Sequence, residues 1–204
     1  MYFALEGIDG SGKSTILKVL KKEFPEATFV REPGTSKFAE NIRNAIFSEN
    51  FGSLKPMTIQ LAMLAARSDL KQYVEDKPFV ISDRCFLSAC YCEEMTNKKD
   101  ISDWIELTKK YSAIPDLIIY LDITADTSIE RVGNRKDKNG YDSINKEDIE
   151  KRIEAYNKWL DISNEFYIRS VKVNANKSIK EVSNEIKTII NDFRSKEVCQ
   201  GKEY

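Results

Sequence analysis

Short apolar runs alternate with longer amphipathic stretches along the chain. The runs predict strands at residues 2–6, 28–31, 79–83, 117–122 and 171–174. Their near-continuous apolar character is typical of strands that helices cover on both faces. An alternation of strand and helix favours an α/β fold. We therefore predict a five-stranded parallel sheet flanked by helices, a three-layer sandwich.

The stretches between the strands repeat their apolar residues with the period of a helix. They predict helices at residues 14–24, 38–47, 56–74, 86–96, 102–111, 127–132, 146–167 and 179–193. Residues 133–143 are charged and contain an Asn-Gly turn signal, so we predict a mobile lid there. Residues 1–194 then form a single domain, and residues 195–204 form a frayed tail.

Composition narrows the possible chemistry. The chain has 204 residues, enough for one domain with its own core, and a net charge of -1. This balance gives no field that attracts nucleic acid or an anionic membrane, so we expect neither as a partner. Histidine is absent, which excludes Ser/His/Asp and Cys/His nucleophiles and zinc sites built on imidazole.

The cysteines and the start of the chain bear on the compartment. No two of Cys85, Cys90, Cys92 and Cys199 have the two-residue gap of a redox or zinc motif, so we interpret them as reduced thiols. The first apolar run ends at Glu6 and no basic segment precedes it, unlike a signal peptide or a membrane span. We therefore expect a cytoplasmic protein.

The strongest motif follows the first predicted strand. In the string GIDGSGKST, Gly7 and Gly12 bracket four residues before Lys13 and Ser14, which is the phosphate-loop (P-loop) pattern between a strand and a helix. Backbone N–H groups there face the phosphates, Lys13 neutralises their oxygens and Ser14 can contact Mg²⁺. The expected ATP contacts are Gly7, Ile8, Asp9, Gly10, Ser11, Gly12, Lys13, Ser14 and Thr15.

A guanine-nucleotide switch is an alternative interpretation of the P-loop. The string Asn-Lys-Lys-Asp at residues 97–100 matches the motif with which such proteins bind guanine. However, it follows a polar helical stretch instead of ending a buried strand, and the Asp-x-x-Gly element at residues 137–140 lies after it instead of before it. A solvated helix end also explains the string.

Four further strings extend the pattern: REPG at residues 31–34, LAMLAARSD ending at Asp69, ISDR at residues 81–84 and PDLIIYLD at residues 115–122. In this order and spacing, from residue 2 to about residue 193, the chain resembles the thymidylate kinase family. The resemblance implies transfer of the γ-phosphoryl group of ATP to dTMP, with Mg²⁺ as cofactor and a homodimer as the assembly. Such catalysis rests on positioning two polyanions and placing cations between them.

The resemblance also assigns residues to the acceptor nucleotide. It implies that Arg31 and Arg84 bind the acceptor phosphate; the alternative for Arg31 is an ion pair with Glu32. Asp83 holds Mg²⁺ through water, unless it only orients Arg84. Asp9 binds the 3'-hydroxyl of the sugar, unless it caps the following helix.

The expected base contacts depart from the family at two positions. Arg67 donates to thymine O4, and Met63 stands where the family has an aromatic that stacks on the base, which predicts looser selection unless Met63 is plain core. Ser88 is a further contact. The family's aromatic on the 2' side of the sugar corresponds to Cys92, so either Tyr91 takes over this role or ribose is excluded less well.

The last catalytic cation is expected in the lid. Family members with glycine at the position of Gly10 place arginines in the lid instead of the P-loop. The candidates are Arg131, on the preceding helix, and Arg135, which we prefer because it lies in the loop. A family arginine corresponds to Gly140, and a merely solvated loop is the alternative. The expected catalytic set is Lys13, Asp83, Arg84 and Arg135.

Two other functions stay open at this point. Met63 and Cys92 would suit a kinase that acts on several deoxynucleoside monophosphates. The reduced number of lid cations would suit a P-loop module that binds nucleotides without catalysis.

Overall fold

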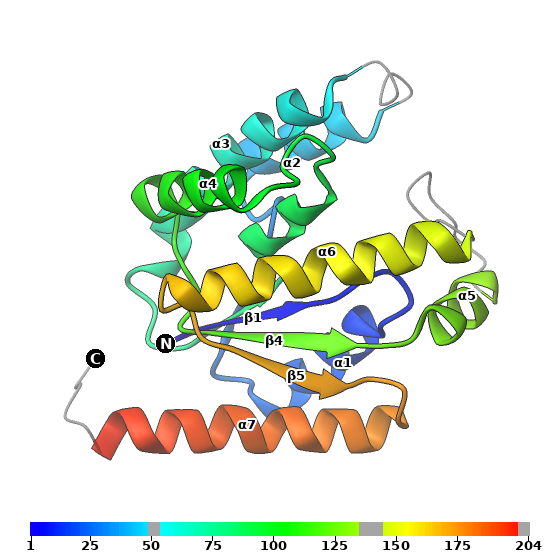
Figure 1. Cartoon of the computed structure of the whole chain (residues 1–204). Helices are drawn as coiled ribbons and strands as arrows, with labels where there is room; N and C mark the ends of the chain where they lie inside the picture. The colour runs from blue at the N-terminus through cyan, green and yellow to red at the C-terminus, as the bar shows by residue number, and fades with distance from the viewer. Residues whose placement is uncertain (49–53, 135–144, 200–204) are drawn as a thin grey trace.

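A computed structural model describes residues 1–48, 54–134 and 145–199 of the chain (Figure 1). Its centre is a five-stranded sheet with the order β2-β3-β1-β4-β5, in which every neighbouring pair is parallel. The strands are β1 (Tyr2–Glu6), β2 (Thr28–Arg31), β3 (Val80–Asp83), β4 (Leu117–Asp122) and β5 (Ser170–Asn174). The predicted parallel sheet is confirmed, and each strand lies within one residue of its predicted bounds.

Burial separates the central strands from the edge strands. β1 is buried along its whole length, and β3 and β4 are buried except at their last residues. In β2 and β5 most residues are only half-buried or are exposed, so the expectation of full cover on both faces is wrong for the edges. An edge strand has one strand neighbour instead of two, and its outer side stays open to solvent.

Helices cover both faces of the sheet (Figure 1). On one face α1 (Lys13–Glu23) packs beside α7 (Ile179–Cys199). On the other face α6 (Lys146–Glu165) packs against α4 (Lys98–Tyr111). α3 (Pro56–Val74) in turn packs against both α4 and α2 (Lys37–Ile46). α5 (Ala125–Gly133) follows β4 at the carboxyl edge of the sheet. Within the described parts of the chain, no helix is long and apolar enough to cross a membrane.

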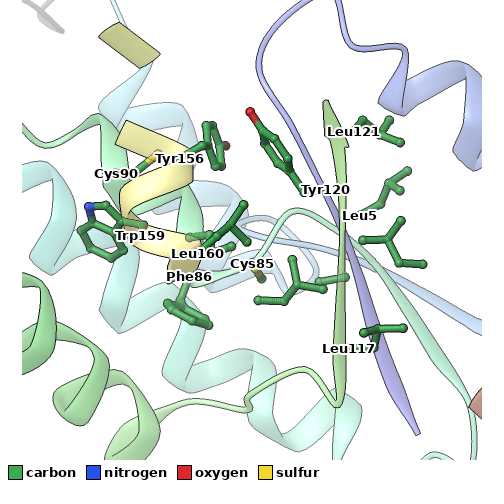
Figure 2. Packing of buried hydrophobic residues seen from close by; sticks show 14 of the residues in the cluster. Leu5, Cys85, Phe86, Cys90, Leu117, Tyr120, Leu121, Tyr156, Trp159 and Leu160 are labelled. Carbon is green, nitrogen blue, oxygen red and sulfur yellow. The ribbon is translucent and has the colours of Figure 1, made fainter. Parts of the chain in front are cut away.

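Aromatic side chains join α6 to the sheet. Tyr120 of β4 and Tyr156 of α6 are fully buried, with ring centroids 5.1 Å apart, and Trp159 and Leu160 continue the contact along the helix (Figure 2). Aromatic rings bury large apolar areas and so dominate the stability of such a contact. This packing fixes α6 firmly against the sheet, which matters because Tyr156 also carries a polar group of the site.

The segment after β3 differs from its prediction. Residues 86–96 were predicted to form an α-helix, but the chain forms a short 3₁₀ helix, η2 (Phe86–Tyr91), followed by turns. The hydrogen bonds here join residues three apart, as from Ser88 N to Cys85 O and from Cys92 N to Ala89 O. Such a helix has three residues per turn, so residues 88 and 91 lie on the same face.

Two helix ends also correct the sequence interpretation. α7 runs to Cys199, beyond the predicted end at residue 193, so the first part of the supposed tail is helical. Residues 179–200 contain no glycine or proline that would end the helix. Arg194 also anchors the helix, because it pairs with Glu26 and lies over the ring of Phe79.

α4 begins at Lys98 because the side chain of Asn97 caps it, accepting a hydrogen bond from the backbone N–H of Asp100. The string at residues 97–100 therefore starts an exposed helix instead of ending a buried strand. This position contradicts the guanine-binding interpretation.

Candidate active site

Charged residues gather where the central strands end. The parallel register places Leu5 of β1 and Arg31 of β2 on either side of Asp83 in β3. The next residue of β1, Glu6, precedes the P-loop. Ligands of open α/β sheets bind outside the carboxyl ends of the strands. The fold therefore brings the residues that were predicted to bind phosphate to the edge of the sheet where a ligand is expected.

The P-loop requires glycine where the chain approaches itself. Gly7 has a φ of 152°, and a Cβ there would lie 2.8 Å from Ser11 Oγ. Gly10 has a φ of 80°, and a Cβ there would lie 2.9 Å from the backbone oxygen of Ser128 in α5. Ser128 Oγ holds this contact by donating to the backbone oxygen of Asp9 (2.8 Å). A larger side chain at position 10 would therefore push α5 away.

The other P-loop residues occupy the expected places. Ile8 is buried and its backbone oxygen accepts from Ser11 N (3.2 Å). Gly12 precedes the first turn of α1 and accepts from Thr15 N (3.0 Å). Ser14 is exposed in that first turn, at the positive end of the helix dipole.

Lys13 lies folded against its own loop. Its buried ammonium donates to the backbone oxygens of Gly7 (2.6 Å) and Ile8 (3.0 Å). Burial, together with the charge of Arg84, lowers the pKa of Lys13 to about 7, although nearby carboxylates act in the opposite direction. In the absence of a nucleotide this lysine is therefore only partly charged at neutral pH.

We expect ATP binding to take up a proton. Above pH 7 the Lys13 amine of the free protein is mostly neutral, whereas phosphate oxygens favour its ammonium form. ATP affinity should therefore fall as the pH rises above about 7, by up to about tenfold per pH unit. Calorimetry at pH 8 in buffers of different ionisation enthalpy measures the uptake, with Lys13→Met as the control. A binding enthalpy of the unmodified protein that is the same in all buffers would contradict the expectation.

Six of the predicted substrate residues line one pocket. They are Asp9, Met63, Arg67, Arg84, Ser88 and Tyr91. The same pocket is also lined by residues that sequence reasoning did not select, namely Glu32, Pro33, Arg43, Phe47, Ile59, Gln60 and Arg152. Charged residues from several elements of the fold therefore converge on one cavity beside the P-loop.

Arg84 is held over the pocket by a buried carboxylate. Its backbone has a φ of 75°, and its guanidinium lies 3.7 Å from Glu6 Oε2 and 3.4 Å from Asp9 Oδ1. It also donates to the hydroxyls of Ser88 and Tyr156, each at 3.4 Å. Glu6 lies on β1, Ser88 on η2 and Tyr156 on α6, so contacts with three different elements fix the guanidinium in place.

Glu6 is the main functional residue that sequence reasoning missed. Its side chain is fully buried and accepts from Cys85 N (2.8 Å), Ser88 Oγ (2.9 Å) and Tyr156 Oη (2.9 Å). A buried charge needs such partners. The only signal in the sequence was a carboxylate at the end of an apolar strand.

Asp9 points toward two cations. Its Oδ1 lies 3.4 Å from Arg84 and its Oδ2 lies 3.6 Å from Arg152 of α6. The residue that precedes α1 is Gly12, with no side-chain cap, so the capping alternative for Asp9 is wrong. Arg152 was not predicted, and its guanidinium also lies over the ring of Tyr91, 5.2 Å from the centroid.

Arg67 and Glu32 form a buried ion pair in the pocket wall. The distance from Arg67 Nε to Glu32 Oε2 is 2.9 Å, and each side chain is only 2% exposed. Burial raises the pKa of Glu32 to about 7, although Arg67 opposes this shift. An ion pair with Glu32 was the alternative role predicted for Arg31 from the sequence. Because Glu32 is buried and pairs with Arg67 instead, that alternative is wrong.

Arg31 lies outside the described pocket lining. Its side chain is exposed, and its backbone N–H donates to Thr35 Oγ1 (2.9 Å). Arg31 and Arg43 both lie beside Gly34, where a Cβ would come within 3.9 Å and 3.6 Å of their Cδ atoms. A phosphate-binding role for Arg31 stays a prediction.

The 3₁₀ geometry of η2 decides which side chain faces the pocket. Ser88 and Tyr91 line the pocket together, as expected for residues three apart in such a helix. Cys92 is buried and is absent from this lining; it lines a second cavity beside α6, which Tyr91 also borders. Of the two residues, only Tyr91 therefore lies in the pocket beside the P-loop.

The donor set predicted for Mg²⁺ is the hydroxyl of Ser14 and the carboxylate of Asp83. Among the described residues, no cluster of three or more Cys, Asp or Glu side chains could hold a metal ion. Mg²⁺ is commonly held by one or two carboxylates together with substrate phosphates. The Asp83 carboxylate makes no hydrogen bond or ion pair within the described chain, whereas a role in orienting Arg84 would require such a contact. Asp83 and Ser14 therefore fit the ion.

The two lid candidates stand differently. Arg131 of α5 donates to the backbone oxygen of Gly10 (3.4 Å), so it lies at the P-loop. Arg135 and Gly140 lie outside the described residues, as does most of the predicted lid. The expected contacts of Arg135 therefore stay predictions.

The fold and the pocket together define the class of protein. A parallel sheet, a strand–P-loop–helix unit and an arginine-lined pocket at the same edge are the features of a P-loop nucleoside monophosphate kinase, which is a phosphotransferase.

The chain belongs to the thymidylate kinase family, whose pattern it matches over residues 5–186. A thymidylate kinase of Helicobacter pylori (strain P12) is 29% identical over 200 residues, covering 93% of this chain and 98% of the relative. A thymidylate kinase of Nautilia profundicola is 28% identical over 199 residues, covering 95% and 98%.

Solved structures agree on the fold. A thymidylate kinase from Candida albicans has a TM-score of 0.73 at 22% identity, covering 95% of this chain and 92% of that one. A deoxyadenosine kinase from M. mycoides has a TM-score of 0.69 at 23% identity, covering 94% and 100%. At this identity the likeness concerns the fold alone.

Proposed function

We propose that the chain transfers the γ-phosphoryl group of ATP to the 5'-phosphate of dTMP, giving ADP and dTDP. The observation that carries the proposal is the single pocket that Asp9 of the P-loop, Arg84 and Arg67 line together. ATP would bind with its phosphates at Lys13. The acceptor phosphate would bind at Arg84, and the base would lie between Met63 and Arg67.

Electrostatics would supply most of the catalysis. The transferring group carries negative charge on its oxygens, and both nucleotides are polyanions. Lys13 and Arg84 flank the point where their phosphates meet, and each is held by oxygens of the protein before any ligand binds. Side chains that are already in place, with Lys13 becoming fully charged when ATP binds, reduce the reorganisation needed to reach the transition state.

Ser14 and Asp83 would hold Mg²⁺ together with the ATP phosphates. When bound, the ion supplies further neutralisation of phosphate charge. Arg131, already at the P-loop, would contact ATP. Arg135 would be the catalytic cation of the lid, as the sequence predicts.

The sugar would be bound by Asp9 and Tyr91. Asp9 would accept from the 3'-hydroxyl, and its present contacts with Arg84 and Arg152 hold its side chain at the pocket. Burial raises the pKa of Tyr91, so its ring carries a neutral hydroxyl at working pH. We propose that this ring, in place of Cys92, excludes the 2'-hydroxyl of ribose.

A coupled assay of ADP release tests the proposed activity. The substrates are dTMP, dUMP, dCMP, dGMP, UMP and AMP with Mg²⁺ and ATP. We expect the highest kcat/KM with dTMP and at least about tenfold less with UMP, because a ribose hydroxyl would meet Tyr91. Comparable rates with UMP and dTMP would contradict the proposed substrate.

A broader deoxynucleoside monophosphate kinase is the second candidate. Met63 favours it, because this side chain lines the pocket at the place of an aromatic and adapts to rings of different shape. Rates with dCMP and dGMP close to that with dTMP would support this second candidate.

We also propose a homodimer that works in the cytoplasm. Phe38 of α2 and Leu61 of α3 are 54% and 52% exposed on two helices that pack together, which supports an interface there. Cys85, Cys90 and Cys92 are free thiols, which suits a reducing compartment. Light scattering should give twice the mass of the chain, and Leu61→Glu should reduce it to that of a monomer.

A further inference from the structure

Gln60 is a buried amide in the wall of the acceptor pocket. It lies on α3, about one turn before Met63 and two turns before Arg67, and all three line the cavity. Gln60 is 7% exposed, and its Oε1 is buried without a hydrogen-bond partner among the residues that the structure describes. A buried acceptor without a donor is unfavourable, so such a group in a pocket wall indicates a donor on the ligand.

The neighbouring ion pair is incompletely bonded in the same way. Arg67 Nη1 and Glu32 Oε1 are buried and have no hydrogen-bond partner within the described chain, although the two residues bond to each other through Nε and Oε2. Gln60, Arg67 and Glu32 thus each keep an unused atom, and the hydroxyl of Tyr91 in the same lining is also buried without a partner among the described residues. The clustering of these atoms at one pocket points to recognition of a polar ligand edge.

We propose that Gln60 is a specificity-determining residue that binds the polar edge of the base. Its amide oxygen accepts from N3–H of a 4-oxopyrimidine while Arg67 donates to O4. This inference rests on the proposed dTMP kinase activity and adds a residue to its acceptor site.

The chemistry of the two side chains explains the selection. Thymine and uracil present an acceptor, O4, beside a donor, N3–H, whereas cytosine presents a donor beside an acceptor. Arg67 can only donate, and its ion pair with Glu32 fixes it in that role. A cytosine amino group would therefore face a guanidinium with no acceptor to offer.

Met63 makes this polar recognition more important. A thioether chain covers a base but imposes less geometry than an aromatic ring. With Met63 between Gln60 and Arg67 on one face of α3, the two polar groups are left to fix the rotation of the base within its plane. Gln60 thereby compensates for the aromatic that is absent at position 63.

The test combines an isosteric variant with a modified substrate. Gln60→Met keeps the length and helix propensity of the side chain and removes the amide. Gln72→Met is the matched control, because Gln72 lies exposed on the same helix. The kcat/KM is measured with dTMP, dCMP and N3-methyl-dTMP, which lacks the N3–H. Melting temperatures report whether the variants fold.

In the unmodified protein we expect dTMP to be preferred over N3-methyl-dTMP by at least about tenfold, because the methylated base leaves Gln60 unbonded. Gln60→Met should reduce that preference by about tenfold and raise the KM for dTMP, with the kcat and the KM for ATP nearly unchanged. Gln72→Met should behave like the unmodified protein.

Failure of this inference differs from failure of the proposed function. If the unmodified protein turns over dTMP and N3-methyl-dTMP within about threefold of each other, Gln60 does not bind N3–H. An equal loss with all three substrates in Gln60→Met assigns the residue a structural role and overturns the inference. No turnover of dTMP by the unmodified protein would instead reject the activity itself. If Gln60→Met does not fold, the comparison of the two thymine substrates in the unmodified protein decides.

Discussion

Replacing Lys13 by alanine is expected to lower the kcat for dTMP phosphorylation by about 10²- to 10³-fold. Lys13 lies folded against the P-loop, where its amine donates to the backbone oxygens of Gly7 and Ile8, and the ATP phosphates are expected at the backbone N–H groups of the same loop. Loss of one preorganised charge contact in a water-excluded site typically reduces the rate by two to three orders of magnitude. A neighbouring solvent-exposed lysine could not take its place, because the P-loop backbone fixes the position of the amine.

Lys18→Ala is the matched control, because Lys18 is exposed on the same helix. It should leave kcat and both KM values within about twofold of the unmodified protein. The melting temperature should change little in Lys13→Ala, since a buried amine with a lowered pKa adds little to stability. Retention of more than a tenth of the rate in Lys13→Ala would reject the P-loop assignment.

Arg84→Gln should lower kcat/KM for dTMP by about 10³-fold. The guanidinium is the cation closest to both Asp9 and the buried Glu6, and glutamine keeps hydrogen-bonding capacity without the charge. Removing one partner of a buried hydrogen-bonded charge pair costs about 2–5 kcal/mol, which corresponds to this loss. The KM for ATP should change far less than the KM for dTMP, because Arg84 is assigned to the acceptor.

Arg84→Gln should also lower the stability of the fold, because the variant leaves Glu6 less well paired. Part of the measured loss of kcat/KM will therefore come from reduced stability. Arg194→Gln separates the two effects. Arg194 stacks on Phe79 and pairs with Glu26, far from the pocket, so its loss should lower the melting temperature and leave kcat/KM nearly unchanged. Equal losses of kcat/KM in the two variants would reject the catalytic role of Arg84.

The elements that carry local signals could be predicted from the sequence. The strands read as apolar runs, and the P-loop is one continuous string between β1 and α1. Asp9, Arg67 and Arg84 stand in short motifs, and each lies in the pocket as expected. Asp9 and Arg84 follow strand ends, which share one edge in a parallel sheet, whereas Arg67 lies on α3 and was identified by its family string.

The residues that support the site could not be predicted in the same way. Tyr156 lies 150 positions after Glu6, and its hydroxyl meets that carboxylate only because α6 packs across the sheet. Arg152 reaches Asp9 for the same reason. In the sequence both residues belong to an ordinary amphipathic helix. The period of its apolar residues predicts the helix but not which charged groups of other elements its side chains will contact.

Helix type is a second limit of sequence reasoning. An α-helical period would place residue 92 on the face of residue 88, whereas the 3₁₀ turns of η2 place Tyr91 there. The choice between the two geometries follows from contacts across the fold, such as Glu6 holding Cys85 N and Ser88 Oγ. The 3₁₀ geometry therefore supports the proposal that Tyr91 takes the place of the family's aromatic, which the sequence alone aligned with Cys92.

A crystal structure with a bisubstrate analogue, adenosine and thymidine joined through a chain of phosphates, tests the central claim most directly. We expect the Lys13 amine and the Arg84 guanidinium to lie within about 3.2 Å of phosphate oxygens, on the two sides of the point of transfer. Arg84 still bound only to Asp9 and Glu6, with the phosphates lying elsewhere, would contradict the account.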